Sequence, residues 1–191
     1  KKAMLLILQT IYSVWPTDKP VDQATSELLP RLKNYFTKAF REAKEQTSWL
    51  NPDEAFENNI HEFITRLLDC STFTDRLDAY LRNHEASARR LSLALTALKL
   101  CLPGIPDLYH GAERQDLSLV DPDNRRPVDI NLLRQQLATQ SAAADAPNVK
   151  QLLMQRLLAL RRRKPTLFAN GSYQPIGVQS DQAPIFGFER A

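Results

Sequence analysis

The chain has 191 residues, of which 25 are Lys or Arg and 22 are Asp or Glu, so its formal charge is +3. A chain of this length can bury one sizeable core, and so balanced a charge argues against nucleic acid as a partner. Cys70 and Cys101 stand alone without clustered histidines, which excludes the usual metal-binding motifs and is typical of a cytoplasmic enzyme. The longest apolar run, Ala3 to Leu8, is too short to cross a membrane.

Helical spacing of apolar residues predicts a helical region over residues 1–102. The first helix should run from Met4 to Trp15, and a polar loop should cover Thr17 to Gln23. Helical spacing resumes from Ser26 and predicts a second helix there.

Two further helices are expected in the same region. The sequence Asn51-Pro52-Asp53-Glu54 is typical of a helix start, with Asn51 as the cap and Pro52 as the first helical residue. The pattern restarts at Ser71 and predicts a long helix, with Asn83 as the place where it could break.

The stretch from Pro103 to Asp129, PGIPDLYHGAERQDLSLVDPDNRRPVD, is the most informative part of the chain. Pro103-Gly104 and Gly111 bracket a short apolar strand, Ile105 to Tyr109, and a polar loop follows. Carboxylates, amides and guanidinium groups can hydrogen-bond the vicinal hydroxyls of a polyol in pairs. The loop offers such groups at Glu113, Asp116, Asp121, Asp123, Asn124, Arg125 and Arg126. A strand, a polar loop and a helix in this order resemble one unit of a β/α barrel, in which functional groups lie at the strand's C-terminal end.

The last third of the chain should be helical and then extended. Asp129 is expected to cap a short helix that ends near Ala138, and small residues at 141–147 read as a linker. A further helix is expected from Gln151 to Arg163, followed by strands at 172–178 and 185–189.

The stretch from Pro103 to Asp129 resembles the eighth barrel strand and following loop of maltooligosyltrehalose synthase, a family of the α-amylase clan. GIPDLYHGAE is shared by many members of the clan, whereas DLSLVDPDNRRPVD is specific to the synthase. REAKEQTSWLNPDEAFE (41–57) and LLALRRRKPTLFANGSYQPI (157–176) also resemble synthase segments. One departure is that Arg114-Gln115 stands where the family shows an aliphatic residue and Trp. The missing aromatic argues against sugar stacking at residue 115.

The resemblance implies a mainly α chain that carries the last strand–helix unit of a (β/α)8 barrel and the start of a C-terminal β domain. Three regions are expected: a helical region at 1–102, the barrel unit at 103–168, and an incomplete β domain at 169–191. Because a whole barrel needs eight strand–helix units, we expect the chain to be a piece of a longer one. Because the neighbouring barrel strands are then missing, we expect that the chain self-associates through surfaces left uncovered, or that Ile105 to Tyr109 is extended but unpaired, or helical, instead of a barrel strand.

The resemblance also implies intramolecular transglucosylation of a maltooligosaccharide, without a metal or organic cofactor. The clan's three catalytic carboxylates lie on strands four, five and seven, which would precede residue 1, so no catalytic residue is expected here and the isolated chain should be inactive. The residues expected to bind substrate are Trp49, Tyr109, His110, Glu113, Asp116, Asp121, Asp123, Asn124, Arg125 and Arg126.

Several alternatives stay open at this point. Asp-Pro-Asp-Asn is also ordinary turn chemistry, and Arg125 or Arg126 could pair with Asp121 or Asp123 for structural reasons alone. Trp49 could be a buried anchor instead of a sugar platform. The whole protein could be a hydrolytic member of the clan, or the chain could be a helical binding domain without chemistry.

Overall fold

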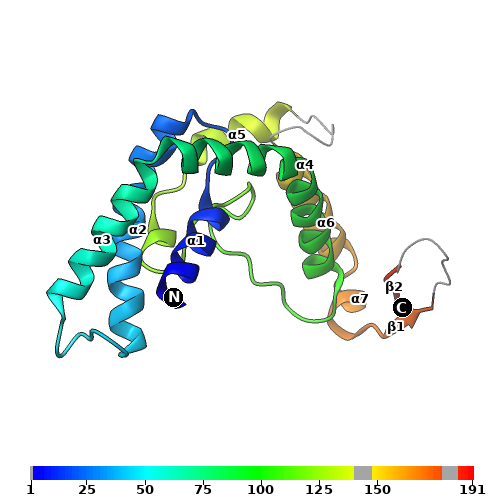
Figure 1. Ribbon diagram of the computed structural model, residues 1–191. Helices are drawn as coiled ribbons and strands as arrows, with labels where there is room; N and C mark the ends of the chain where they lie inside the picture. Colours follow the sequence, from blue (N-terminus) through cyan, green and yellow to red (C-terminus); the bar gives the residue numbers. More distant parts are fainter. Residues whose placement is uncertain (1, 140–147, 178–184) are drawn as a thin grey trace. The chain divides into compact units, whose positions relative to one another are not determined.

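The structure is a computed structural model that describes residues 2–139, 148–177 and 185–191. The chain forms two compact units (Figure 1). Unit 1 contains residues 1–86 and 117–127, and unit 2 contains residues 87–116 and 128–191. The mainly helical fold class is confirmed, whereas the barrel unit is not formed within the described residues.

Unit 1 is built from α1 (Lys2–Val14), α2 (Val21–Ala43), α3 (Glu54–Leu68) and the first half of α4 (Ser71–Cys101). Helices α2 and α3 pack side by side (Figure 1). Their apolar stripes meet in one core, whose buried members are Ile7, Ile11, Val14, Trp15, Ala24, Leu28, Leu32, Phe36, Ile64, Leu68 and Leu119. All but Leu119 lie on helices or directly after one, so a residue of the polar loop completes this helical core.

Two predicted boundaries in unit 1 are wrong by a few residues. Helix α2 begins at Val21 instead of at Ser26, because the Ala24 N–H already donates to the Pro20 carbonyl, at 2.9 Å. In α3 the cap is Asp53, whose side chain accepts the Phe56 N–H at 2.9 Å, and Asn51 lies outside the helix. Asn and Asp both cap helices well, and only the geometry of the preceding turn decides between Asn51 and Asp53.

Helix α4 runs without a break from Ser71 to Cys101, so a break near Asn83 does not occur. The sequence of α4 contains neither Gly nor Pro, and those residues are the usual causes of a sharp kink.

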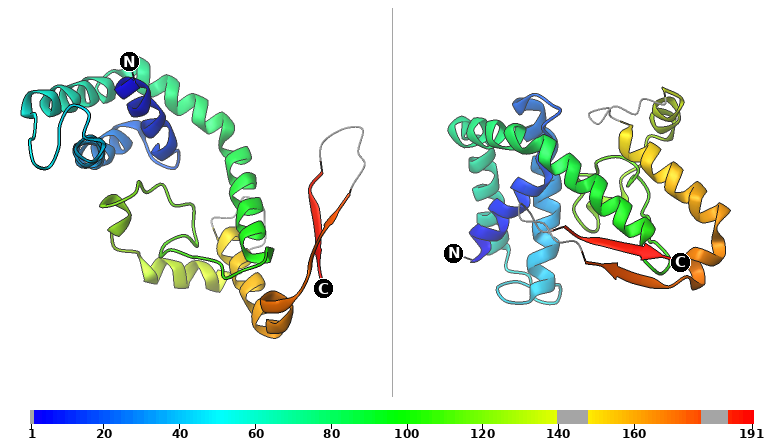
Figure 2. Two further views of the ribbon diagram at one scale, coloured as in Figure 1. Left: turned by 90° about the horizontal axis from the view of Figure 1, so that it is seen from below. Right: turned by 90° about the vertical axis from the view of Figure 1, so that its right-hand side faces the viewer.

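Unit 2 contains the second half of α4, α5 (Ile130–Thr139), α6 (Val149–Arg163), α7 (Pro165–Asn170), β1 (Tyr173–Ile176) and β2 (Gly187–Arg190). The two strands pair antiparallel with Tyr173 opposite Arg190 (Figure 2). Asp129 caps α5 as predicted, since its Oδ1 accepts the Leu132 N–H at 2.9 Å. The expected linker at 141–147 lies outside the described residues, as does the end of the first predicted strand.

The segment Ile105 to Tyr109 forms no paired strand within the described residues, which is one of the outcomes expected when the neighbouring barrel strands are missing. The segment has no β-bridge partner in the described part of the chain, and Ile105 is 97% exposed. A strand is stable only when a neighbour satisfies its backbone donors and acceptors, and the described residues supply no such neighbour. The segment is attached to α4 instead, because Lys99 Nζ donates to the Asp107 carbonyl at 3.0 Å.

Candidate functional site

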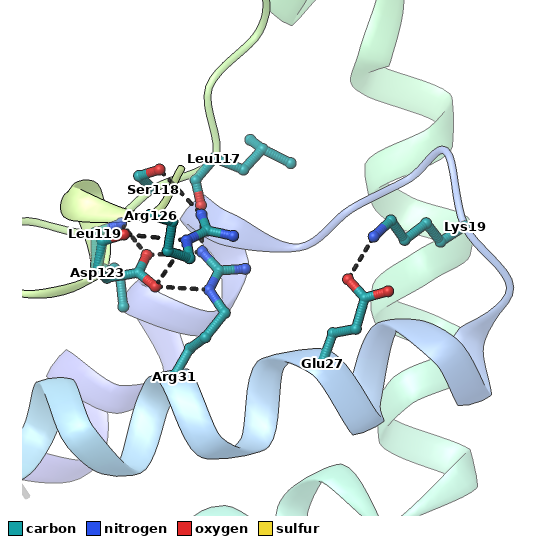
Figure 3. A network of polar contacts seen from close by, with 8 residues as sticks. All are labelled: Lys19, Glu27, Arg31, Leu117, Ser118, Leu119, Asp123 and Arg126. Carbon is teal, nitrogen blue, oxygen red and sulfur yellow. Dashed lines mark hydrogen bonds and ion pairs between the residues drawn. The ribbon is translucent and has the colours of Figure 1, made fainter. Parts of the chain in front are cut away.

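The loop at residues 117–126, called the polyol loop below, is organised around the buried carboxylate of Asp123 (Figure 3). Arg31 on α2 binds both of its oxygens, with Nε to Oδ1 and Nη2 to Oδ2, each at 2.8 Å. The Leu119 N–H donates to Oδ2 at 2.7 Å, and Arg126 Nε lies 3.3 Å from Oδ1. Asp123 therefore joins two points of its own loop to a helix that lies far away in the sequence.

Three further contacts attach the polyol loop to the helices of unit 1. Arg31 Nη2 also donates to the Leu117 carbonyl at 2.6 Å, and Lys38 Nζ donates to the Asp121 carbonyl at 2.7 Å. Leu119 is buried among the apolar residues of the core. Since Arg31 and Lys38 both belong to α2, one helix holds both arms of the loop.

The charge on Asp123 is stabilised by its partners. Burial on its own would raise the pKa of the carboxyl, but the hydrogen bonds from Arg31 and from the Leu119 N–H outweigh burial and hold the pKa below its usual range. The carboxylate therefore stays ionised at neutral pH, as a bidentate guanidinium pair requires.

The outer side of the polyol loop carries exposed charged groups. Arg125 pairs with Asp121 at 2.5 Å, and their side chains are 70% and 42% exposed. Arg126 Nη2 donates to Ser118 Oγ at 3.0 Å. The structural alternative of internal Arg–Asp pairs is thus realised, although the main partner of Asp123 is Arg31. Asn124 Oδ1 is buried and accepts no hydrogen bond within the described residues.

Trp49 lies on the turn that precedes α3. It is 57% exposed, so the alternative of a buried anchor is wrong, and the guanidinium carbon of Arg41 lies 5.0 Å from the centre of its ring. The turn is fixed from beneath by Thr47, whose hydroxyl donates to Glu57 at 2.6 Å and accepts the Asp53 N–H at 2.9 Å. Because Trp49 is more than half exposed, its indole ring is accessible to a ligand, with the Arg41 cation beside it.

The other candidate residues belong to unit 2. The rings of Tyr109 and His110 lie 4.2 Å apart between centroids, and Tyr109 is 46% exposed. Asp116 is exposed, whereas Glu113 is half-buried, and its Oε2 is buried without a hydrogen-bond partner in the described chain. Six candidates thus lie in unit 1 and four in unit 2, and the structure brings together those of the polyol loop.

An open, largely apolar cavity of about 570 Å³ lies within unit 2, beside the segment 108–112. Leu91 and Leu95 of α4 and Met154 of α6 form part of its wall, and Lys99 and Lys150 lie at it. Burial lowers the pKa of Lys150, and the nearby Lys99 adds to this effect, while Asp116 and Glu113 oppose it.

Lys150 also anchors the candidate segment. Its Nζ donates to the Arg114 carbonyl at 3.1 Å and so fixes the backbone between Glu113 and Asp116. Arg31, Lys38 and Lys150 carry no motif that marks them in the sequence. The one available signal is that Arg31 stands between Leu28 and Leu32, at the edge of a buried stripe. Groups of three or more metal-binding side chains are absent from the described parts of the chain.

Comparison with known proteins gives one consistent result. No family model matches the chain. A Mycobacterium tuberculosis protein assigned as a maltooligosyl trehalose synthase is 41% identical over 184 residues, which cover 93% of this chain and 22% of that protein. The solved structure of maltooligosyltrehalose synthase from Arthrobacter ramosus matches 97% of this chain and 24% of its own, with 36% identity and a TM-score of 0.78. A hypothetical maltooligosyl trehalose synthase of Sulfolobus tokodaii matches with 29% identity and a TM-score of 0.78.

The chain is therefore a relative of enzymes of trehalose biosynthesis. More particularly, it is homologous to maltooligosyltrehalose synthase along almost its whole length, and it spans about a quarter of the length of those relatives.

Proposed function

We propose that the chain works as part of a maltooligosyltrehalose synthase and that its polyol loop borders the subsite for the reducing-end glucose. The observation that carries this proposal is the homology over 93% of the chain, which includes the whole loop within its most specific motif. The geometry supports it, because the loop is fixed on its inner side and presents charged groups on its outer side.

The proposed reaction moves one glucosyl linkage without consuming water. A carboxylate elsewhere in the synthase attacks the anomeric carbon of the reducing-end α-1,4 bond, and a general acid protonates the departing O4 of the terminal glucose. The freed glucose turns within the site. Its anomeric hydroxyl then attacks the glycosyl-enzyme, displaces the carboxylate and gives its proton to the base, which leaves an α,α-1,1 linkage.

The difficult requirement of this reaction is to keep the freed glucose in place while excluding water, because hydrolysis competes for the same intermediate. Asp121, Arg125 and Arg126 suit this task, since carboxylates and guanidinium groups bind vicinal hydroxyls in pairs. Asp123 acts indirectly in this proposal, as the anchor of the loop. Contacts to the sugar from Trp49, Tyr109, His110, Glu113, Asp116 and Asn124 remain part of the proposal.

A chimaera tests the proposal: the segment of the Arthrobacter ramosus synthase that matches this chain is replaced by the chain itself. In this chimaera Arg125→Ala should lower transfer on maltopentaose about tenfold, because a charged hydrogen bond to substrate is lost. The fraction of glucose released to water should rise at the same time. Melting should barely change, since Arg125 is 70% exposed.

The matched control is Arg66→Ala, which removes another exposed arginine that pairs four residues away, with Glu62 on α3. This variant should leave both transfer and glucose release unchanged. If Arg125→Ala and Arg66→Ala behave alike, the polyol loop does not border the subsite and the proposal is wrong.

A further inference from the structure

We propose that Arg31, a residue of α2 outside every motif of the chain, is a positioning residue for transglucosylation. Through Asp123 it sets the conformation in which the polyol loop presents Asp121 and Arg125 to the sugar. This inference rests on the proposed function, and it assigns a role to a helix that carries no candidate sugar contact.

The contacts of Arg31 are those of a clamp. Its fork binds both oxygens of Asp123 at 2.8 Å and the Leu117 carbonyl at 2.6 Å, so one guanidinium group holds two points of the loop that are six residues apart in the sequence. Asp123 passes this restraint on to a third point, because it accepts the Leu119 N–H at 2.7 Å. The exposed pair Asp121–Arg125 brackets Asp123 in the sequence. Figure 3 shows the contacts of Arg31 and Asp123.

The side chain of Arg31 is itself held in place by its buried surroundings. Arg31 is flanked on α2 by Leu28 and Leu32, both with no exposed surface, and its own side chain is only 15% exposed. The planar guanidinium group of Arg31 loses little conformational entropy when it binds Asp123 and Leu117. A lysine ammonium group cannot reproduce its three directed hydrogen bonds. The chemistry therefore requires arginine at this position, and charge alone is not sufficient.

Unit 1 contains a matched control. Arg82 on α4 likewise binds a buried carboxylate, Asp78, at 2.6 Å and a backbone carbonyl, that of Lys19, at 2.9 Å. Asp78 also accepts a third hydrogen bond, from Trp15 Nε1 at 3.0 Å. The Arg82 pair thus repeats the pattern of the Arg31 pair without touching the polyol loop.

The first test uses hydrogen exchange in the 191-residue chain. Arg31→Met and Arg31→Lys should both accelerate exchange of the Leu119 amide about tenfold, because its acceptor is no longer held in place. Arg82→Met should leave that amide unchanged, even where it lowers the melting temperature. Equal protection of Leu119 in all variants would show that Arg31 does not hold the loop, and the inference would then be wrong.

The second test uses the chimaera. Arg31→Lys keeps the positive charge and so retains part of the stability, but it should still lower the ratio of transfer to glucose release about tenfold, since misplacing a substrate contact is enough to do so. Arg82→Met should keep the wild-type ratio at a similar or lower melting temperature.

The two proposals fail in different ways. If Arg125→Ala changes the ratio and Arg31→Lys does not, the loop borders the subsite and only the positioning role is wrong. If neither variant changes the ratio, the proposed function itself is wrong. Loss of activity in strict proportion to loss of stability, for Arg31 and Arg82 variants alike, would mean that Arg31 has only a structural role.

Discussion

Single residues show why contacts between neighbours in the sequence can be predicted and contacts between distant residues cannot. Asp129 as the cap of α5 could be predicted, because a cap and its acceptor bond depend on three neighbouring residues. The pair Arg31–Asp123 could not be predicted, because its members are 92 positions apart and neither local sequence indicates the other as a partner. For the same reason Arg41 reads as a solvated helix residue, whereas it binds the buried Glu57 through two bonds of 2.7 Å.

The Arg41–Glu57 pair makes stability depend on pH. The hydrogen bonds from Arg41, helped by Thr47, lower the pKa of Glu57 from 4.5 to about 2 despite its burial. A carboxyl with a lowered pKa in the folded state adds stability above its ordinary pKa and loses it as pH falls toward the folded value. We expect the free energy of unfolding to fall between pH 4.5 and pH of about 2 through this group.

Urea unfolding of the chain at several pH values, with and without Glu57→Gln, measures this contribution. The variant should cost about 1–3 kcal/mol near neutral pH, as expected for a lost charged hydrogen bond, and should show a flatter pH dependence in the acid range. An unchanged slope in Glu57→Gln would mean that other carboxyl groups carry the acid sensitivity.

At the scale of elements, helices could be predicted because their determinants are local. Apolar spacing located the helices of unit 1. The errors are the start of α2, the cap of α3, where Asn51 and Asp53 are both good capping residues, and a break in α4 that does not occur. The segment 105–109 could not be predicted in this way, because a strand forms only when a neighbouring strand supplies its backbone hydrogen bonds. Its composition is that of a strand, yet it is extended and unpaired within the described residues.

The position of the α3 cap gives a direct test. Asp53→Ala should lower the free energy of unfolding by about 1 kcal/mol, since the Phe56 N–H loses its acceptor. Asn51→Ala should be close to neutral, because the Asn51 contacts that fix the turn are made by its backbone. If urea unfolding shows that Asn51→Ala lowers the free energy of unfolding more than Asp53→Ala does, Asn51 is the cap and this assignment is wrong.

At the scale of the whole molecule, the chain leaves large apolar groups exposed. Leu91 and Leu95, on the α4 face of the cavity in unit 2, are 60% and 56% exposed. Contiguous apolar surface of this kind favours association. None of the helices in the described residues is long and apolar enough to cross a membrane.

We therefore expect the isolated chain to self-associate, and Leu91→Glu with Leu95→Glu to weaken association at least about tenfold, since two buried leucines would be lost from the contact. Light scattering over a range of concentrations measures the effect. Leu50→Glu is the control, because Leu50 is 99% exposed but lies on the turn before α3. A wild-type chain that stays monomeric throughout would contradict the prediction.

The most direct test of the central claim is product analysis with maltopentaose, using the isolated chain and the folded chimaera side by side. The homology to a quarter of a maltooligosyltrehalose synthase predicts no turnover by the chain alone and a non-reducing product that ends in an α,α-1,1 linkage from the chimaera. A chimaera that melts cooperatively, yet releases only glucose or is inert while its parent synthase is active, would contradict the claim. Turnover by the isolated chain that survives repurification would contradict it as well.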